Sequence, residues 1–218
     1  CIRDSRVSCG ELAGIKIFGN KSFQIVPNAI DINKYKFSPK YRKEIREEFH
    51  LGEHQKVVGM IGILNRFKNQ NFLIELAKKL PEVTFLFVGE GPDRMLLEEN
   101  SRKLTNVIFT GKREDAYKFY SAFDIFAFPS LYEGFPMVLI EAQCSGVDII
   151  MNDTIDSTTQ VANNICTALP LDKNKGIDYI QNVQVMNNKR DFDERLVAFD
   201  INENINVLKE LYLKGLME

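Results

Sequence analysis

The sequence has few of the features that mark several large classes of protein. None of its 4 cysteines stands at the C-x-x-C spacing, which disfavours zinc ribbons and thioredoxin-like chemistry and favours reduced thiols in a cytoplasmic protein. No apolar run approaches the roughly 20 residues of a membrane-spanning helix. The first residues also lack the basic-then-apolar order of a signal peptide. We therefore predict a cytoplasmic location.

The chain also lacks a strong excess of charge of either sign. Its 28 Lys and Arg residues are balanced by 30 Asp and Glu residues, which gives a formal net charge of -2. Nucleic acid is not an expected partner, because its binding requires a basic excess. The two histidines, His50 and His54, have no carboxylate at metal-binding spacing, so no metal site is predicted.

Short β-branched or aromatic runs alternate with helical patterns along most of the chain. Strands are expected at 23–27, 57–62, 83–88, 106–110, 124–128, 147–151 and 164–168, and helices between them at 70–80, 93–103, 114–122 and 136–145. This alternation predicts an α/β fold, a Rossmann-like, doubly wound and mostly parallel sheet. Residues 39–50 are expected to form a surface helix with solvated charges, and the chain from 171 onwards is expected to be mostly helical.

The stretch from Glu133 to Glu141 is the most informative about function. It follows an apolar strand and opens a helix at Pro136, whose fixed φ suits the first helical position. Free amides at such a helix start point at anions, and Gly134 lets the backbone approach a phosphate closely. Glu141 can accept hydrogen bonds from vicinal ribose hydroxyls, while Glu133 stays in the loop, nearer a sugar.

This stretch resembles the motif of Glu, seven residues, Glu in retaining GT-B glycosyltransferases of the family 4 type, which build bacterial polysaccharides. Three further segments are similar to that family in the same order. Residues 26–31 (Val-Pro-Asn-Ala-Ile-Asp) resemble its linker into the donor domain, 65–69 (Asn-Arg-Phe-Lys-Asn) its phosphate loop, and 87–92 (Phe-Val-Gly-Glu-Gly-Pro) its second strand-to-helix turn. The resemblance extends over residues 5–170 of the sequence.

The resemblance implies a site for a nucleoside diphosphate sugar, with uridine as the favoured base and no separate cofactor. It implies catalytic roles for Glu133 and for Lys68, whose ammonium would lie against the donor diphosphate. Donor contacts are expected from Gly62, Arg66, Gly89, Glu90, Gly91, Lys112, Arg113, Gly134, Phe135, Pro136, Met137, Val138 and Glu141. Ile63 departs from the family, which usually has an arginine after the glycine that matches Gly62.

Other interpretations of these residues stay open. Each basic residue is also of a kind found on ordinary surface loops, and the two glutamates could be solvated. Gly89 and Gly91 end an apolar strand as they would in a dinucleotide-binding fold, but Met95 and Leu96 stand where the third glycine of that fingerprint would fall. A dinucleotide-dependent oxidoreductase is therefore disfavoured.

The resemblance also suggests how the chain is divided. Residues 1–22 would be a remnant of an N-terminal acceptor domain and linker, 23–170 the nucleotide-sugar-binding domain, and 171–218 a C-terminal helical segment. The predicted activity moves a hexose from the donor to a polysaccharide or lipid-linked acceptor, with the full-length enzyme peripherally associated with the inner face of the plasma membrane. Because the N-terminal domain is missing, this chain alone is expected to be inactive. The alternative is a non-catalytic sugar-nucleotide-binding module.

Overall fold

The computed structural model describes residues 6–8, 11–163, 165–185 and 190–217, so parts of the predicted segments 1–22, 164–168 and 171–218 lie outside it. Its centre is a six-stranded sheet in the order β5-β4-β3-β6-β7-β8, with every neighbouring pair parallel. The strands are β3 Val57–Ile61, β4 Thr84–Val88, β5 Val107–Gly111, β6 Ile125–Phe128, β7 Asp148–Asn152 and β8 Cys166–Leu169. The predicted doubly wound α/β fold is confirmed.

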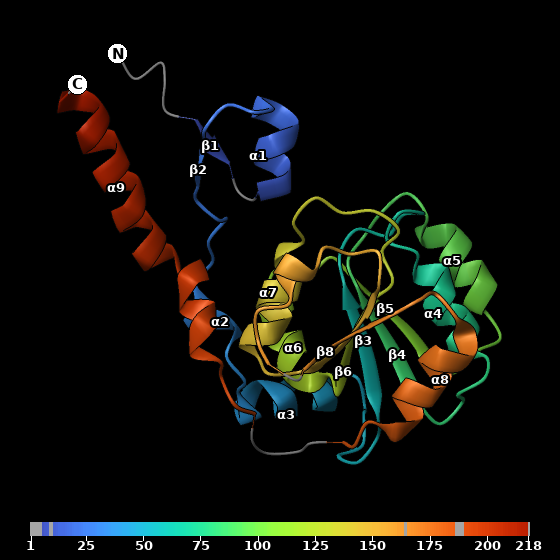
Figure 1. Ribbon diagram of the computed structural model, residues 1–218. Helices are drawn as coiled ribbons and strands as arrows, with labels where there is room; N and C mark the ends of the chain where they lie inside the picture. The colour runs from blue at the N-terminus through green and yellow to red at the C-terminus, as the bar shows by residue number, and fades with distance from the viewer. Residues whose placement is uncertain (1–5, 9–10, 164, 186–189, 218) are drawn as a thin grey trace.

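Helices cover both faces of this sheet (Figure 1). One face carries α4 Gln70–Ala77, α5 Arg94–Ser101 and α8 Lys173–Asn182, and the other carries α3 Pro39–Glu48, α6 Phe119–Ala122 and α7 Met137–Cys144. Successive strand residues enter different cores because side chains alternate across a strand. In β4, Phe85 and Phe87 pack beneath α4 and α5, whereas Leu86 and Val88 pack towards α6 and α7. This two-sided burial produces the continuous apolar runs of the sequence.

Two predicted elements differ from the structure. The strand expected at 23–27 forms only as β2 Gln24–Ile25, and it pairs with β1 Val7–Ser8 in a separate two-stranded parallel sheet. The intervening α1 Glu11–Phe18 packs so closely there that a Cβ on Gly14 would lie 2.1 Å from the Phe23 ring. The helix expected at 114–122 divides into a 3-10 turn, η2 Ala116–Lys118, followed by α6.

The rest of the chain before and after the main sheet is largely helical. The short helix α2 Ile32–Tyr35 contacts α7, and the C-terminal part contains α8, a 3-10 segment η4 Glu194–Phe199 and the long helix α9 Ile201–Met217. Figure 1 shows α9 extending away from the main sheet, on the same side as α1 and the small sheet. The mostly helical character expected from residue 171 onwards is therefore confirmed for the described residues.

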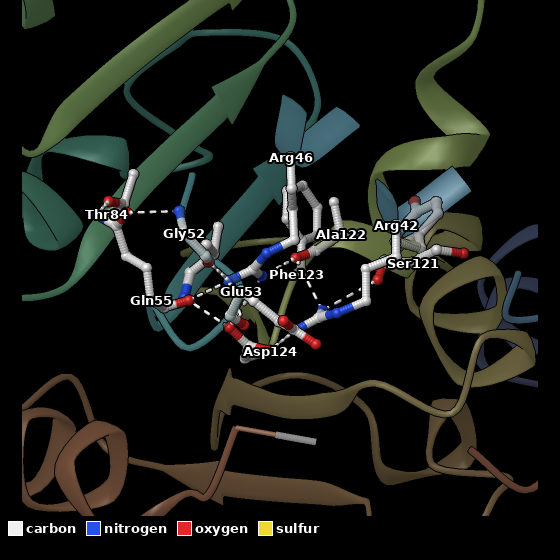
Figure 2. Close-up of polar contacts among 12 residues, drawn as sticks. Arg42, Arg46, Gly52, Glu53, Gln55, Thr84, Ser121, Ala122, Phe123 and Asp124 are labelled. Carbon is white, nitrogen blue, oxygen red and sulfur yellow. Dashed lines mark hydrogen bonds and ion pairs between the residues drawn. The ribbon is translucent and has the colours of Figure 1, made fainter. Parts of the chain in front are cut away.

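The charges of α3 do not all face water, which corrects the prediction for residues 39–50. Arg42 and Arg46 are each only 5% exposed and reach Asp124, whose carboxylate accepts bonds of 2.8 and 3.4 Å from them and one of 2.8 Å from the Val57 amide. Both guanidinium groups also donate to backbone carbonyls around the start of β6, including Ala122 (Figure 2). This cluster fastens α3 to the N-terminal ends of β3 and β6.

Candidate functional site

The C-terminal ends of β3, β4 and β5 meet at three glycines, Gly62, Gly89 and Gly111. The Gly89 amide donates to the Gly111 carbonyl over 3.0 Å, and a Cβ on Gly89 would lie 2.0 Å from the Gly62 carbonyl oxygen. Gly89 also has a φ of 141°, so a side chain would be excluded there on two grounds. A cleft of about 360 Å³ opens over this edge and is lined by Ile61, Gly62, Ile63, Val88, Gly89, Glu90, Lys112, Arg113 and Ala116.

The loop after β3 is tied to the loop after β6. Asn65 shapes the first loop, because its side-chain oxygen accepts bonds of 3.0 Å from the amides of Phe67 and Lys68. The Phe67 carbonyl then accepts from the Leu131 amide over 2.8 Å, and the Asn69 side chain donates to the Pro129 carbonyl over 3.2 Å. These bonds bring together two segments that are far apart in the sequence.

Lys68 and Glu133, predicted separately as catalytic, form an ion pair in this structure. The Lys68 Nζ lies 2.7 Å from Glu133 Oε1 and 5.1 Å from the centroid of the Phe128 ring. Their side chains are 18% and 15% exposed, so the pair is sheltered but can still be reached by a ligand. The ammonium can bind an anion, and the carboxylate can accept hydrogen bonds from sugar hydroxyls.

The helix that follows this pair has an open start. Pro136 is the cap residue of α7, with φ -78° and ψ 98°, and not its first helical residue as predicted. Proline offers no side-chain acceptor, so the amides of Met137 and Val138 receive no side-chain cap. A Cβ on Gly134 would meet nothing within 4 Å, which leaves open space beside the helix start. The arrangement suits an anion.

The Phe135 side chain, predicted to contact the donor, packs against another aromatic ring. Its ring stacks on Phe199 of η4, with centroids 5.9 Å apart, and belongs to the apolar cluster beneath that segment. This stacking keeps the ring against the protein, and the predicted donor contact of Phe135 stays a prediction. Any contact from Phe135 to a donor would have to come from its backbone.

Glu141 lies on α7 with its carboxylate turned to two tyrosines that the sequence interpretation missed. The Tyr120 hydroxyl donates to Glu141 Oε2 over 2.6 Å, and the Tyr35 hydroxyl also favours the ionised form of this carboxylate. Burial raises the pKa of Glu141, while the two hydroxyls and Lys34 act in the opposite direction. A signal existed: a tyrosine in an apolar run and a carboxylate in an apolar helix each need a polar partner.

The remaining predicted charges differ in how they are engaged. The Arg113 guanidinium is held by Asp115 and by Glu48, whose Oε2 accepts from Nη2 over 2.9 Å. Because both carboxylates hold its guanidinium, Arg113 is poorly placed to supply the positive charge that the resemblance expects at Ile63. Glu90 is bound by Arg94.

Other predicted donor contacts are more exposed or are fixed by backbone packing. Lys112 is exposed, and so is Arg66, whose guanidinium carbon lies 4.6 Å from the centroid of the Phe67 ring. Gly91 packs so closely that a Cβ there would lie 2.2 Å from the Leu64 carbonyl oxygen. Among the described residues, no three His, Cys, Asp or Glu side chains are placed to hold a metal ion. Within the same part of the chain, every helix is too short or too polar to cross a bilayer.

Comparison with known proteins gives this edge of the sheet a family context. A family model described as "Glycosyl transferases group 1" matches residues 41–197, which is more than half of the chain. The chain belongs to this glycosyltransferase family. The putative glycosyltransferase EpsF of Bacillus subtilis is 30% identical over 223 residues, covering 94% of this chain and 58% of that protein. An Escherichia coli UDP-Gal:alpha-D-GlcNAc-diphosphoundecaprenol alpha-1,3-galactosyltransferase is 30% identical, with 64% of this chain and 38% of that protein covered.

Solved structures share the fold. The crystal structure of HepE from Anabaena in complex with UDP-glucose aligns with a TM-score of 0.76 and 22% identity, covering 95% of this chain and 63% of that one. Sucrose-phosphate synthase from Thermosynechococcus elongatus aligns with a TM-score of 0.78 and 20% identity, covering 97% and 58%. These structural neighbours are GT-B glycosyltransferases, so the predicted fold type is confirmed. This glycosyltransferase chain spans less than two thirds of the length of these relatives.

Proposed function

We propose that this chain is the donor-binding half of a retaining, family 4-type glycosyltransferase and that its cleft binds a nucleoside diphosphate sugar. The observation that carries the proposal is the Lys68–Glu133 pair, held at 2.7 Å beside the uncapped start of α7. A cation, helix amides and a carboxylate therefore lie at the edge where open α/β sheets bind ligands. The first two suit a diphosphate and the third suits a sugar.

Each group would have a distinct role. Lys68 and the amides of Met137 and Val138 would hold the diphosphate and stabilise its charge as it leaves the sugar. Glu133 would accept hydrogen bonds from the sugar, and Glu141 from the ribose hydroxyls. The glycine turns would admit the nucleoside into the cleft, with the backbone of Lys112 and Arg113 framing its base.

The names of related proteins support a uridine donor and a bacterial cell-surface acceptor. The similar galactosyltransferase uses UDP-Gal with a diphosphoundecaprenol-linked acceptor, and HepE was solved with UDP-glucose. By analogy, the whole protein would move a hexose to a saccharide or lipid-linked acceptor, with association at the membrane surface. This chain would bind the donor without transferring it, because transfer requires donor and acceptor to be held together and shielded from water.

Calorimetric titration of the chain with UDP, ADP, GDP and UDP-glucose tests the proposal. We expect saturable binding of UDP that Glu141→Ala weakens through loss of the ribose contacts. Glu133→Ala should not weaken UDP binding but should weaken UDP-glucose. Glu82→Ala is the matched control. Glu82 is an exposed carboxylate just before β4, at the N-terminal end of the strands and away from the cleft. The proposal fails if no nucleoside diphosphate binds, or if both site variants affect both ligands equally.

A sugar-nucleotide-binding module without catalysis is a second candidate. The observation that favours it is Ile63, a 49% exposed aliphatic side chain lining the cleft where the resemblance calls for an arginine. A radiolabelled transfer assay on the whole protein separates the two candidates, since only the enzyme would release labelled product. Both candidates predict nucleotide binding by this chain and no transfer by it.

A further inference from the structure

The two tyrosines that hold Glu141 have no part in the function proposed above. Tyr120 is completely buried, and its hydroxyl lies 2.6 Å from Glu141 Oε2. Tyr35 interacts with the same carboxylate across the contact between α2 and α7. The two rings meet edge to face with centroids 5.9 Å apart, so each ring restricts the other.

The elements that carry these tyrosines also border the cleft. Tyr120 lies on α6, which continues directly from the 3-10 turn η2, and Ala116 of that turn lines the cleft. Lys34, next to Tyr35 on α2, places its Nζ 4.6 Å from the centroid of the Tyr117 ring on η2. The support of the Glu141 carboxylate is therefore built into the same wall as the nucleoside cleft.

A buried carboxylate would not by itself stay ionised or fixed. Burial raises the pKa of Glu141, and hydrogen bonds that donate to the charged form oppose that shift. An ionised carboxylate offers about four lone-pair sites, so Glu141 keeps acceptor capacity for two ligand hydroxyls beside the bond from Tyr120. Fixing the side chain in advance also reduces the entropy lost when a ligand binds.

We infer that Tyr35 and Tyr120 are positioning residues that hold Glu141 as a ready acceptor for the vicinal hydroxyls of a ribonucleoside. The inference rests on the proposed function and goes further, because it assigns the choice of ribose over deoxyribose to a triad of side chains. Neither tyrosine needs to touch the ligand. They act through the carboxylate.

The titratable and charged groups around Glu141 come from three helices. Lys34 and Tyr35 approach from α2, Tyr120 from α6, and Cys144 from α7 itself. Burial and the negative charge of Glu141 raise the pKa of Tyr35 to about 12 and that of Cys144 to about 12, and raise that of Tyr120 well above its usual value. Tyr35, Tyr120 and Cys144 are therefore expected to stay uncharged at neutral pH, so Glu141 is the acidic group of this set that carries the charge.

The test compares the dissociation constants of UDP and 2′-deoxy-UDP by calorimetry from pH 5 to 9. The unmodified chain should prefer UDP by about tenfold at neutral pH, the range expected for a hydrogen bond to a charged group. Tyr120→Phe and Tyr35→Phe should each reduce this preference at least threefold. As the pH is lowered, the preference disappears when Glu141 becomes protonated. This point should lie at a higher pH in both variants, because fewer hydrogen-bond donors then oppose the effect of burial on the pKa of Glu141.

Tyr179→Phe is the matched control. It removes a tyrosine hydroxyl beside Thr167 on the opposite face of the sheet, and it should leave the preference unchanged. Circular dichroism checks that each variant folds. If Tyr120→Phe does not fold, Tyr35→Phe alone tests the inference, because Tyr35 is only half-buried. An unchanged preference and pH profile in the folded variants would overturn the inference while UDP binding persists. Absence of any UDP binding by the unmodified chain would overturn the proposed function as well.

Discussion

The two ends of the central sheet use the same kind of ion pair in opposite ways. At the N-terminal end, Asp124 is fully buried and its carboxylate accepts from Arg42, Arg46 and a backbone amide (Figure 2). At the C-terminal end, Lys68 and Glu133 share one hydrogen bond of 2.7 Å and keep 18% and 15% of their side-chain surface exposed. The first pair is enclosed by protein, and the second lies beside open space.

The difference shows how burial separates a structural pair from one that can change partners. Removing one charge of an enclosed pair strands the other in a medium that solvates it poorly. In a partly exposed pair, water or a ligand can replace the missing partner. A phosphate that approaches Lys68 can therefore compete with Glu133, whereas no ligand can reach the buried Asp124 carboxylate to replace its arginines.

Stability should show the largest effect. Asp124→Ala leaves two buried guanidinium groups without their carboxylate and should cost about 3–5 kcal/mol of unfolding free energy. Glu133→Ala, the matched change at the other end, should cost less than about 1 kcal/mol. Urea denaturation followed by circular dichroism measures both. Similar losses would abolish the distinction between the two ends.

The affinity for UDP should depend on Lys68 more than on Arg66. Lys68→Ala removes the cation beside the start of α7 and should weaken binding at least tenfold, since bonds between charged groups are worth about 1.5–3 kcal/mol. Arg66→Ala is the control of equal charge, and we expect a change below about twofold because its guanidinium is exposed over the Phe67 ring. A larger effect from Arg66→Ala would indicate that Arg66, and not Lys68, binds the diphosphate.

Competition within the Lys68–Glu133 pair predicts a smaller change of opposite sign. Glu133→Gln frees the ammonium from its internal partner and should tighten UDP binding by up to about fivefold, the value of a partly exposed pair. The same variant should bind UDP-glucose less well relative to UDP, because the amide is a poorer acceptor for sugar hydroxyls. Calorimetry with both ligands measures the two effects, and weaker UDP binding would show that the pair does not compete with phosphate.

The smallest change is expected at Ile63. Ile63→Arg adds a cation at the mouth of the cleft and should tighten UDP binding about twofold to threefold at low salt, with less effect at moderate salt because the attraction is partly screened. Ile63→Gln, of similar length and without charge, is the control. An unchanged affinity for Ile63→Arg would show that Lys68 and the helix amides already suffice.

The sequence predicted the sheet well because both of its faces are buried. A strand such as Val57–Ile61 then appears as a continuous apolar run, and parallel connections place all following loops at one edge. The pairing of Lys68 with Glu133 could not be predicted, since it depends on β3 and β6 being neighbours although two strands separate them in the chain.

The partners of buried polar groups were the other feature that the sequence did not predict. Arg42 and Arg46 have the spacing of an ordinary solvated helix face, and only the position of Asp124 makes their burial favourable. For the same reason the sequence around Tyr35 and Tyr120 did not reveal Glu141 as their common partner. Local periodicity reports which side of a helix faces the core, but the partner of a buried polar atom comes from another element.

The strand order has a consequence for how the site forms as the chain folds. β3, β4 and β5 lie side by side in chain order, so the glycine turns can assemble as soon as these strands pair. Glu133 arrives later, when the chain has returned across the sheet and β6 has paired with the free side of β3, 65 positions after Lys68. Contacts between distant segments form late because chain entropy must be lost first. The cleft walls are therefore expected to form before the carboxylate that completes the site takes its place.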